Sequence, residues 1–353
     1  MNMRGVIAIL VGFAALATIL VAGAGAAGPS VTVGGNLAYA AIDPRDGMSD
    51  IYVKPPGGLA SVNITHSADT HKDGSPVFAP NGSKIAFVRA SAQGGASIMV
   101  VNPDGTGLVN VTPVQLRTAI NTDPSWSADG TRIAFSSNFD GNYDLYWIDA
   151  STGATQLSLP HRLTKTETPV QNHDPSWAPS GKDLVFSRTG NGISDTNSAE
   201  LFRVEVATLR VGRLTRTLAG RGDLSPVYAP NGLSIAFSSD HAGNEDVYIF
   251  NLTTKTITAV TNNPARDFQP AFSPDGTAIV YVSTRTGATE LFAQNLIGLT
   301  PGPAAPVQLT FDGADKSHPD WGATVTHPGP VGAPVETPLP TPTSGTASPT
   351  AAR

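Results

Sequence analysis

The chain has 353 residues, of which 14% are charged and 40% hydrophobic, and it contains 36 glycines and 29 prolines. This composition is typical of a turn-rich globular protein and argues against long helices. The formal net charge of -6 without a lysine or arginine cluster excludes the electrostatic footprint of a nucleic-acid binder, and the absence of cysteine excludes disulfides, thiolate metal sites and a catalytic thiol.

The first segment, residues 1–28, is predicted to direct export. Arg4 precedes an unbroken run of apolar and small residues at positions 5–23, and Ala24-Gly25-Ala26 fits a small-x-small cleavage site. We predict a cleaved signal peptide. The apolar run of about 19 residues is also long enough for an uncleaved membrane anchor, which stays open as the alternative and would be the protein's only membrane contact. We therefore expect the protein in the periplasm, at the cell surface or outside the cell.

A repeated phrase occupies most of the remaining chain. Its copies are SPVFAPNGSKIAF from Ser75, DPSWSADGTRIAF from Asp123, DPSWAPSGKDLVF from Asp174, SPVYAPNGLSIAF from Ser225, QPAFSPDGTAIVY from Gln269 and the truncated HPDWG from His318. Successive prolines of the phrase are 48, 51, 51, 44 and 49 residues apart. Such a period is that of propeller blades and not of most helical or leucine-rich solenoids.

Each repeat predicts four antiparallel strands. The Pro-Asn-Gly and Pro-Asp-Gly sequences predict tight turns, because proline fixes φ and glycine permits positive φ. Each turn leads into an apolar second strand, at residues 85–87, 133–135, 184–186, 235–237 and 279–281. A hairpin and an alternating third strand follow. The fourth strand is expected to end in a threonine, namely Thr112, Thr164, Thr215, Thr261 or Thr310.

An aromatic residue stands two positions after each proline of the phrase. These residues are Phe78, Trp126, Trp177, Tyr228, Phe272 and Trp321. One large ring per repeat is what packing between neighbouring sheets needs, so we predict that this column fills the spaces between blades. An aromatic ligand-binding platform is the alternative.

The two ends of the repeat region complement each other. Strand-like segments begin at Asn36, Asp50 and Asn63 and supply second, third and fourth strands without a first, while the orphan HPDW supplies a first strand. We predict an all-β, six-bladed β-propeller over residues 36–322, its last blade closed by strands from both termini. Closure removes the exposed edges that favour aggregation. Residues 327–353 are rich in Pro, Thr, Ser and Ala and are predicted to form a disordered tail.

The phrase Pro-x-aromatic-Ser/Ala-Pro-Asp/Asn-Gly-x-x-Ile-Ala-Phe, with a following hairpin such as STRTGATELF from Ser283, resembles the WD40-like Pro-Asp propeller repeat of the TolB family. The resemblance covers residues 36–322 and implies the propeller fold. TolB itself carries an additional α/β domain before its propeller. We expect none here, because the apolar run leads almost directly into the first strand.

Polar residues before each proline are expected to surround one mouth of the channel. If the first strand of each blade runs down the channel, its start and the hairpin between the second and third strands share one end, which we call the upper face. The predicted ring consists of Asp73, Ser75, Asn121, Asp123, Asn172, His173, Asp174, Asp223, Ser225, Asp267, Gln269, Lys316 and His318. From it we select five candidate ligand-binding residues: Asp123, His173, Asp174, Gln269 and His318. The alternative is a solvated polar lining in which Asp before Pro shapes strand entry.

Motifs for catalysis or metal binding are missing from the sequence. There is no Gly-x-Ser-x-Gly elbow, Ser-x-x-Lys pair or phosphate-binding loop, so no catalytic residue is assigned. No cofactor is expected; a divalent cation held by oxygen and imidazole donors stays open, although no EF-hand or His-Glu-x-x-His spacing supports it. The Asp/Asn/Gly-rich segments 138–144 and 240–246 are interpreted as tight hairpins and not as cation loops.

We therefore expect an exported, monomeric, non-enzymatic propeller that binds a protein or cell-envelope component through its upper face. One alternative is an exported lyase or hydrolase acting on polysaccharide or peptide, with Asp123, Asp174, His173 and His318 as acid, base or metal ligands. A purely structural surface module is the other.

Overall fold

The computed structural model describes residues 34–57, 60–66, 71–92, 94–150, 159–190, 198–218 and 220–323. The predicted export segment (residues 1–28) and the predicted tail (residues 327–353) lie outside these ranges. A single turn of 3-10 helix, η1 (Val114–Leu116), is the one helical element among the described residues. No helix in that part of the chain has the length and apolarity needed to cross a membrane.

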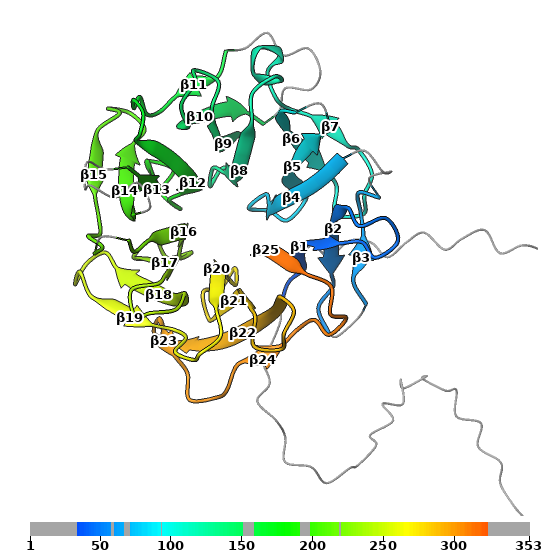
Figure 1. Ribbon diagram of the computed structural model, residues 1–353, viewed down its shortest axis with the longest axis vertical. Coiled ribbons are helices and arrows are strands. Elements are labelled where there is room, and N and C mark those ends of the chain that lie inside the picture. The colour runs from blue at the N-terminus through cyan, green and yellow to red at the C-terminus, as the bar shows by residue number, and fades with distance from the viewer. Residues whose placement is uncertain are drawn as a thin grey trace, which may run out of the picture.

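Six antiparallel sheets form blades around a common central axis (Figure 1). In each blade one strand lies nearest to this axis and the others follow outward, which confirms the predicted six-bladed propeller. Five blades consist of consecutive strands. They contain β4 (His71–Phe78), β5 (Ile85–Ser91), β6 (Ala96–Val101) and β7 (Val109–Asn110); β8 (Asn121–Trp126), β9 (Arg132–Ser137), β10 (Asp144–Asp149) and β11 (His161–Arg162); β12 (Gln171–Trp177), β13 (Asp183–Thr189), β14 (Ala199–Glu205) and β15 (Val211–Arg213); β16 (Asp223–Tyr228), β17 (Ser234–Ser239), β18 (Asp246–Asn251) and β19 (Ile257–Ala259); and β20 (Asp267–Phe272), β21 (Ala278–Ser283), β22 (Glu290–Ile297), β23 (Thr300–Pro301) and β24 (Val307–Gln308).

The blade of β20 to β24 has one strand more than predicted. β22 is eight residues long, and its two halves have different outer partners. β24 pairs with Phe292 and Ala293, whereas β23 pairs with Leu296 and Ile297 as a short hairpin extension. The extra strand therefore lengthens the rim of this blade and leaves the four-stranded plan unchanged.

The sixth blade, here called the closing blade, combines both ends of the repeat region. It contains β1 (Leu37–Ile42), β2 (Ser49–Lys54), β3 (Val62–Asn63) and β25 (Lys316–Trp321), in the order β25-β1-β2-β3. Leu37 lies opposite Trp321 and Ala41 opposite Lys316. Figure 1 shows the orange strand β25 beside the blue strand β1, as the prediction of closure by both termini required.

The aromatic column packs between blades, as predicted. Each of its six residues is at most 8% exposed. Trp177, for example, contacts the apolar cluster that contains Ala134 and Leu145 of the preceding blade. Burying a ring of this size contributes about 4 to 6 kcal/mol before the entropy cost of ordering it. The column is therefore part of the core, one ring per interface between blades.

The threonine of each repeat joins the fourth strand to the third. Its Oγ1 accepts a hydrogen bond from a backbone N–H of the third strand, at 2.7 Å from Ile98 N to Thr112 and 2.9 Å from Leu145 N to Thr164. The same contact recurs at Thr65, Thr215, Thr261 and Thr310. Thr65 supplies it in the closing blade. The paired fourth strand itself ends earlier, at Asn110 in the first of these blades, so the threonine side chain continues the ladder where backbone pairing stops.

Candidate functional site at the channel

Each innermost strand contains a β-bulge formed by the proline of the repeat and the residue before it. In the β4–β7 blade the register shifts between Gly74 and Val77, so that Ser75 and Pro76 together lie opposite Phe87. The same shift occurs in all six innermost strands. The residue before the proline has a φ of 48° at Ser75, 54° at Asp123, 53° at Asp174, 49° at Ser225, 52° at Gln269 and 49° at His318.

These left-handed conformations differ from the extended backbone that a residue before proline usually adopts. The bulge explains the difference, because an extra residue must be accommodated between ladder pairs that are fixed on both sides. A non-glycine residue in this region costs about 1 to 3 kcal/mol, and such positions concentrate at ligand-binding and catalytic sites. The channel is therefore surrounded by six residues that the fold holds in a strained geometry.

The bulges turn these side chains into the channel. A cavity of about 150 Å³ lies there, lined in each blade by the residue before the proline, the proline and the residue after it. Four of the five predicted site residues, Asp123, Asp174, Gln269 and His318, line this cavity.

His173 is not among the residues that line the channel cavity. Its ring lies against Tyr143, with 4.6 Å between the ring centroids, and its Nε2 is 3.3 Å from Gln171 Oε1. His173 is the last regularly paired residue before the bulge, opposite Ser187, whereas Asp174 belongs to the bulge itself. His173 therefore does not converge with the other four predicted residues.

The polar residues two positions before the bulge do not ring the mouth, which corrects the expectation from sequence. All six are buried, with at most 4% exposure: Asp73, Asn121, Asn172, Asp223, Asp267 and Lys316. The bulge that follows them breaks the alternation, so their side chains enter the blades. Asp73, for instance, forms an ion pair with Arg89 (2.6 Å), and Asp267 forms one with Arg285 (2.9 Å).

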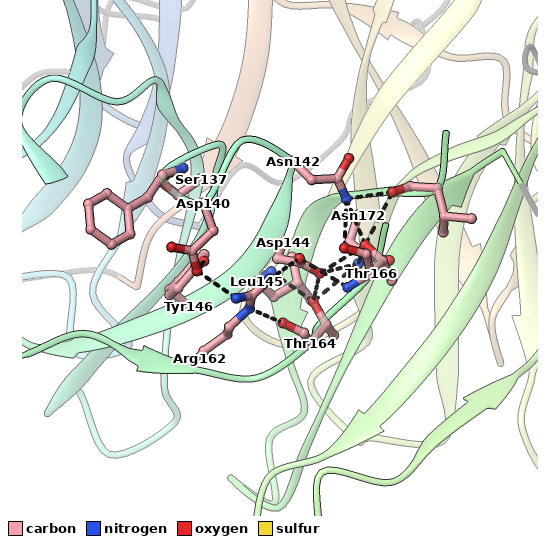
Figure 2. Close-up of polar contacts among 12 residues, drawn as sticks. Ser137, Asp140, Asn142, Asp144, Leu145, Tyr146, Arg162, Thr164, Thr166 and Asn172 are labelled. Carbon is pink, nitrogen blue, oxygen red and sulfur yellow. Dashed lines mark hydrogen bonds and ion pairs between the residues drawn. The ribbon is translucent and has the colours of Figure 1, made fainter. Parts of the chain in front are cut away.

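Figure 2 shows one such buried network, in which Asp144 of β10 is the central acceptor. Its carboxylate accepts hydrogen bonds from Arg162 Nη2 (2.7 Å), Thr164 Oγ1 (2.7 Å) and Thr166 Oγ1 (3.0 Å). Asn172 Nδ2, from the innermost strand of the next blade, donates to the same carboxylate at 2.8 Å. The network ties two blades together, so these polar residues belong to the scaffold.

The segment 138–144, interpreted from sequence as a tight hairpin, supports this network. Gly141 has a φ of 85°, and Asn142 Nδ2 donates to Val170 O at 2.7 Å. Asp140 accepts hydrogen bonds from Tyr146 and Arg162. Among the described residues, no group of three or more His, Asp or Glu side chains is placed to hold a metal ion.

Two carboxylates from adjacent blades face the same cavity. Burial, and next the charge of Asp174, raises the pKa of Asp123 to about 7. Thr122 Oγ1 donates to Asp123 Oδ2 at 2.8 Å. Asp174 Oδ2 accepts from Ser187 Oγ at 2.9 Å and from the backbone N–H of Ser225, in the next blade, at 3.1 Å. Burial therefore favours the protonated form of Asp123 in this cavity.

Gln269 and His318 form the neutral part of the lining. Gln269 Oε1 accepts from the backbone N–H of His318 at 2.8 Å, and Gln269 Nε2 lies 2.9 Å from His318 Nε2. Because the amide nitrogen can only donate, His318 Nε2 must accept, which places the ring proton on Nδ1. Burial lowers the pKa of His318, against the charge of Asp174, and favours this neutral ring. Nδ1 is buried and has no hydrogen-bond partner among the described residues.

Sequence reasoning overlooked the residues after each proline. Ser125 Oγ accepts the backbone N–H of Trp177 at 3.1 Å, and Ser176 Oγ accepts that of Tyr228 at 3.1 Å. Asp320 Oδ2 accepts the N–H of Phe78 at 2.7 Å, and burial raises the pKa of Asp320 to about 6. The sequence feature that could have identified these residues is their constant position in the aligned repeats, one residue after the proline.

Comparison with known proteins agrees with the fold. A family model for the TolB beta propeller domain matches residues 28–219 and 195–326. The uncharacterized peptidase YuxL of Bacillus subtilis is 25% identical over 216 residues, which cover 49% of this chain and 31% of YuxL. The Tol-Pal system protein TolB of Francisella tularensis is 31% identical over 104 residues, which cover 29% of this chain and 22% of that protein. The chain thus spans less than a third of the length of either curated relative.

Among solved structures, TolB from Acinetobacter baumannii superimposes with a TM-score of 0.66 at 20% sequence identity. The superposition covers 82% of this chain and 67% of the other. At that identity the likeness shows the fold alone.

Proposed function

Since this chain belongs to the TolB β-propeller domain family, we propose that it is an exported, non-enzymatic protein that binds a protein or cell-envelope component through its upper face. The export part of this proposal rests on the signal-like residues 1–28. The proposed class of partner is taken from the name of a relative, a Tol-Pal system protein.

The observation that carries the proposal is the ring of strained bulge residues around the channel. Six left-handed residues present two carboxylates, two hydroxyls, an amide and an imidazole to one cavity. The fold holds them in place by ladder pairs on both sides, so they are pre-organised and a partner does not have to order them. That arrangement favours recognition of a group inserted from the upper face.

Exposed apolar side chains at the upper ends of the blades support partner binding on this face. Ile120 and Phe139 are 40% and 43% exposed, and the backbone N–H of Ile120 donates to Asn138 Oδ1, so this segment lies against the β9–β10 hairpin. Leu224, directly before the bulge residue Ser225, is 38% exposed. Apolar side chains exposed on one face are a common feature of protein interfaces.

The size of the cavity favours a binding role over the enzymatic alternative. Its volume of about 150 Å³ is smaller than the roughly 300 to 1,000 Å³ of pockets that enclose a drug-sized substrate. It accommodates a side chain or a few waters, which suits an inserted anchor from a macromolecule.

Site-specific photo-crosslinking in the organism that makes the protein tests the proposal. A photoreactive phenylalanine analogue replaces Phe139 on the upper face or, as the matched control, Leu233 in a lower-face turn, where the native side chain is 56% exposed. We expect discrete adducts from position 139 only, and several-fold fewer when Asp123 and Asp174 are both changed to Asn. Equal adducts from both positions, or a yield at 139 indifferent to the two carboxylates, would refute binding at the mouth.

A further inference from the structure

Four short sequences in the chain match the acceptor pattern for N-linked glycosylation, an asparagine followed two positions later by serine or threonine. In an exported protein such an acceptor is expected on a surface loop, where a transferase can reach it. The structure distinguishes the four sequences by what the asparagine side chain and the hydroxyl already contact. They are Asn63-Ile64-Thr65, Asn81-Gly82-Ser83, Asn110-Val111-Thr112 and Asn251-Leu252-Thr253.

Two of these sequences have an essential group in the protein interior. Asn63 is 8% exposed, and its Nδ2 donates a hydrogen bond to Asp50 Oδ2 at 2.6 Å. In the sequence that starts at Asn110, Thr112 is fully buried, and its Oγ1 accepts a hydrogen bond from the backbone N–H of Ile98 at 2.7 Å. A transferase that acts on the folded chain therefore reaches neither the amide of Asn63 nor the hydroxyl of Thr112.

The sequence at Asn251 lies nearer the surface but lacks a contact between the hydroxyl and the amide. Asn251 is half-buried at the end of β18, and its Oδ1 accepts the backbone N–H groups of Thr253 and Thr254 at 2.9 and 3.0 Å. Within the described part of the chain, the Thr253 hydroxyl makes no hydrogen bond to this amide. The asparagine is thus held by backbone groups alone.

Asn81 combines exposure, a free amide nitrogen and a hydroxyl on its own carbonyl oxygen. It is exposed in the lower-face turn between β4 and β5. Its Oδ1 accepts the backbone N–H of Ser83 at 3.0 Å and the Ser83 hydroxyl at 2.7 Å, whereas its Nδ2 donates to none of the described residues. The two donors orient the amide. A sugar on Nδ2 leaves both hydrogen bonds in place, because they use the oxygen.

The β16–β19 blade contains the same turn without the hydroxyl. Asn231 is exposed, and its Oδ1 accepts the backbone N–H of Leu233 at 2.8 Å. The glycines that follow the two asparagines have nearly equal φ, 71° at Gly82 and 69° at Gly232. The third residue of this turn is leucine where the β4–β5 turn has serine. The chain therefore supplies a matched pair of turns that differ at the position on which N-linked glycosylation depends.

We propose that Asn81 is a site of N-linked glycosylation, with a glycosyl diphosphate as the sugar donor. Nδ2 forms a bond to the anomeric carbon of the sugar, and the bond from that carbon to the diphosphate oxygen breaks. The diphosphate leaves with its electron pair, and the amide proton passes to a base of the transferase. The sugar lies on the lower face, so the channel mouth stays uncovered. This inference rests on the export part of the proposed function.

Mass spectrometry of the full chain tests the proposal, with the protein isolated separately from the exported and intracellular fractions of the organism that makes it. The peptides are fragmented under conditions that retain the sugar, because an Asn-Gly pair can also become Asp by spontaneous deamidation. In exported protein we expect a saccharide on Asn81, with an occupancy at least about tenfold higher than at Asn63, Asn110 or Asn251, since a surface turn is the accessible acceptor.

The two fractions separate failure of this proposal from failure of the proposed function. Exported protein with unmodified Asn81 would overturn the glycosylation site and leave export intact. Protein confined to the intracellular fraction would overturn the export proposal and, with it, the glycosylation site.

Variants of the two matched turns provide the second readout. Ser83→Ala removes the hydroxyl and is expected to abolish modification of Asn81, whereas Ser83→Thr keeps a hydroxyl and should retain it. Leu233→Ser creates Asn-Gly-Ser in the matched turn and is expected to add a sugar at Asn231. Leu233→Ala is its control and should add none. Leu233 is 56% exposed, so both of its variants should keep the melting temperature. Undiminished modification in Ser83→Ala, an unmodified Asn231 in exported Leu233→Ser, or equal occupancy of all four natural acceptor sequences would overturn the proposal.

Discussion

Replacement of Asp144 by Asn is expected to destabilise the propeller strongly. Asp144 has no solvent exposure and accepts hydrogen bonds from Arg162, Thr164, Thr166 and Asn172 (Figure 2). The Asn variant keeps the volume but puts an amide N–H group against donors and leaves Arg162 without its buried carboxylate partner. Breaking a buried, hydrogen-bonded ion pair in this way costs about 3 to 5 kcal/mol. We expect a loss of that size in the free energy of unfolding.

Urea denaturation followed by tryptophan fluorescence measures this loss, because Trp177 belongs to the same apolar cluster as Leu145, the neighbour of Asp144. Glu245→Gln is the matched control. Glu245 pairs with Arg266 at 2.7 Å, but the arginine side chain is 61% exposed, so its loss should cost less than about 1 kcal/mol. Equal losses in the free energy of unfolding for the two variants would refute the argument that the Asp144 network is stabilising because it is buried and not merely because it pairs charges.

Two further predictions concern the channel and the closing blade. The folded pKa of Asp123, about 7, lies above its usual value, so its contribution to stability is present at low pH and is lost as pH rises through 7. The melting temperature of Asp123→Asn relative to the parent should therefore be higher at pH 8 than at pH 4, and a pH-independent difference would contradict this. Separately, a Cβ at Gly35 would stand 2.0 Å from the carbonyl oxygen of Gly322, whereas one at Gly34 meets nothing within 4 Å. Gly35→Ala should lower the melting temperature and speed proteolysis after β25, whereas Gly34→Ala should do neither. Equal melting temperatures and proteolysis rates for the two variants would argue against tight packing between Gly35 and Gly322.

The fold was predictable because the same sequence pattern recurs in every blade. Copies of one phrase with a proline, an aromatic residue and a tight turn predicted six blades, and the truncated copy at His318 predicted the closing strand. Repetition also placed the aromatic column correctly, since a ring at one register position in every blade has few uses other than interblade packing.

The candidate site was only partly predictable, because the β-bulge has no signature in the alternation of the strand. Simple alternation puts Asp73 and Ser75 on one side, yet the bulge sends Ser75 to the channel and leaves Asp73 buried against Arg89. His173 was expected beside Asp174, but it precedes the bulge and packs against Tyr143, so it does not line the cavity.

Under the proposed function, the bulge residues hold neighbouring innermost strands together and also present polar groups to a partner, and the geometry of Asp174 is compatible with both roles. Both of its hydrogen bonds from described residues, from Ser187 Oγ and from the Ser225 backbone N–H, fall on Oδ2. The contact to Ser225 links one innermost strand to the next, so a partner that displaced it would weaken the ring that positions the site. Oδ1 is the oxygen that a partner can engage without that loss. A group entering the mouth therefore adds to the ring of hydrogen bonds, and binding at the upper face is expected to stiffen the propeller instead of opening it.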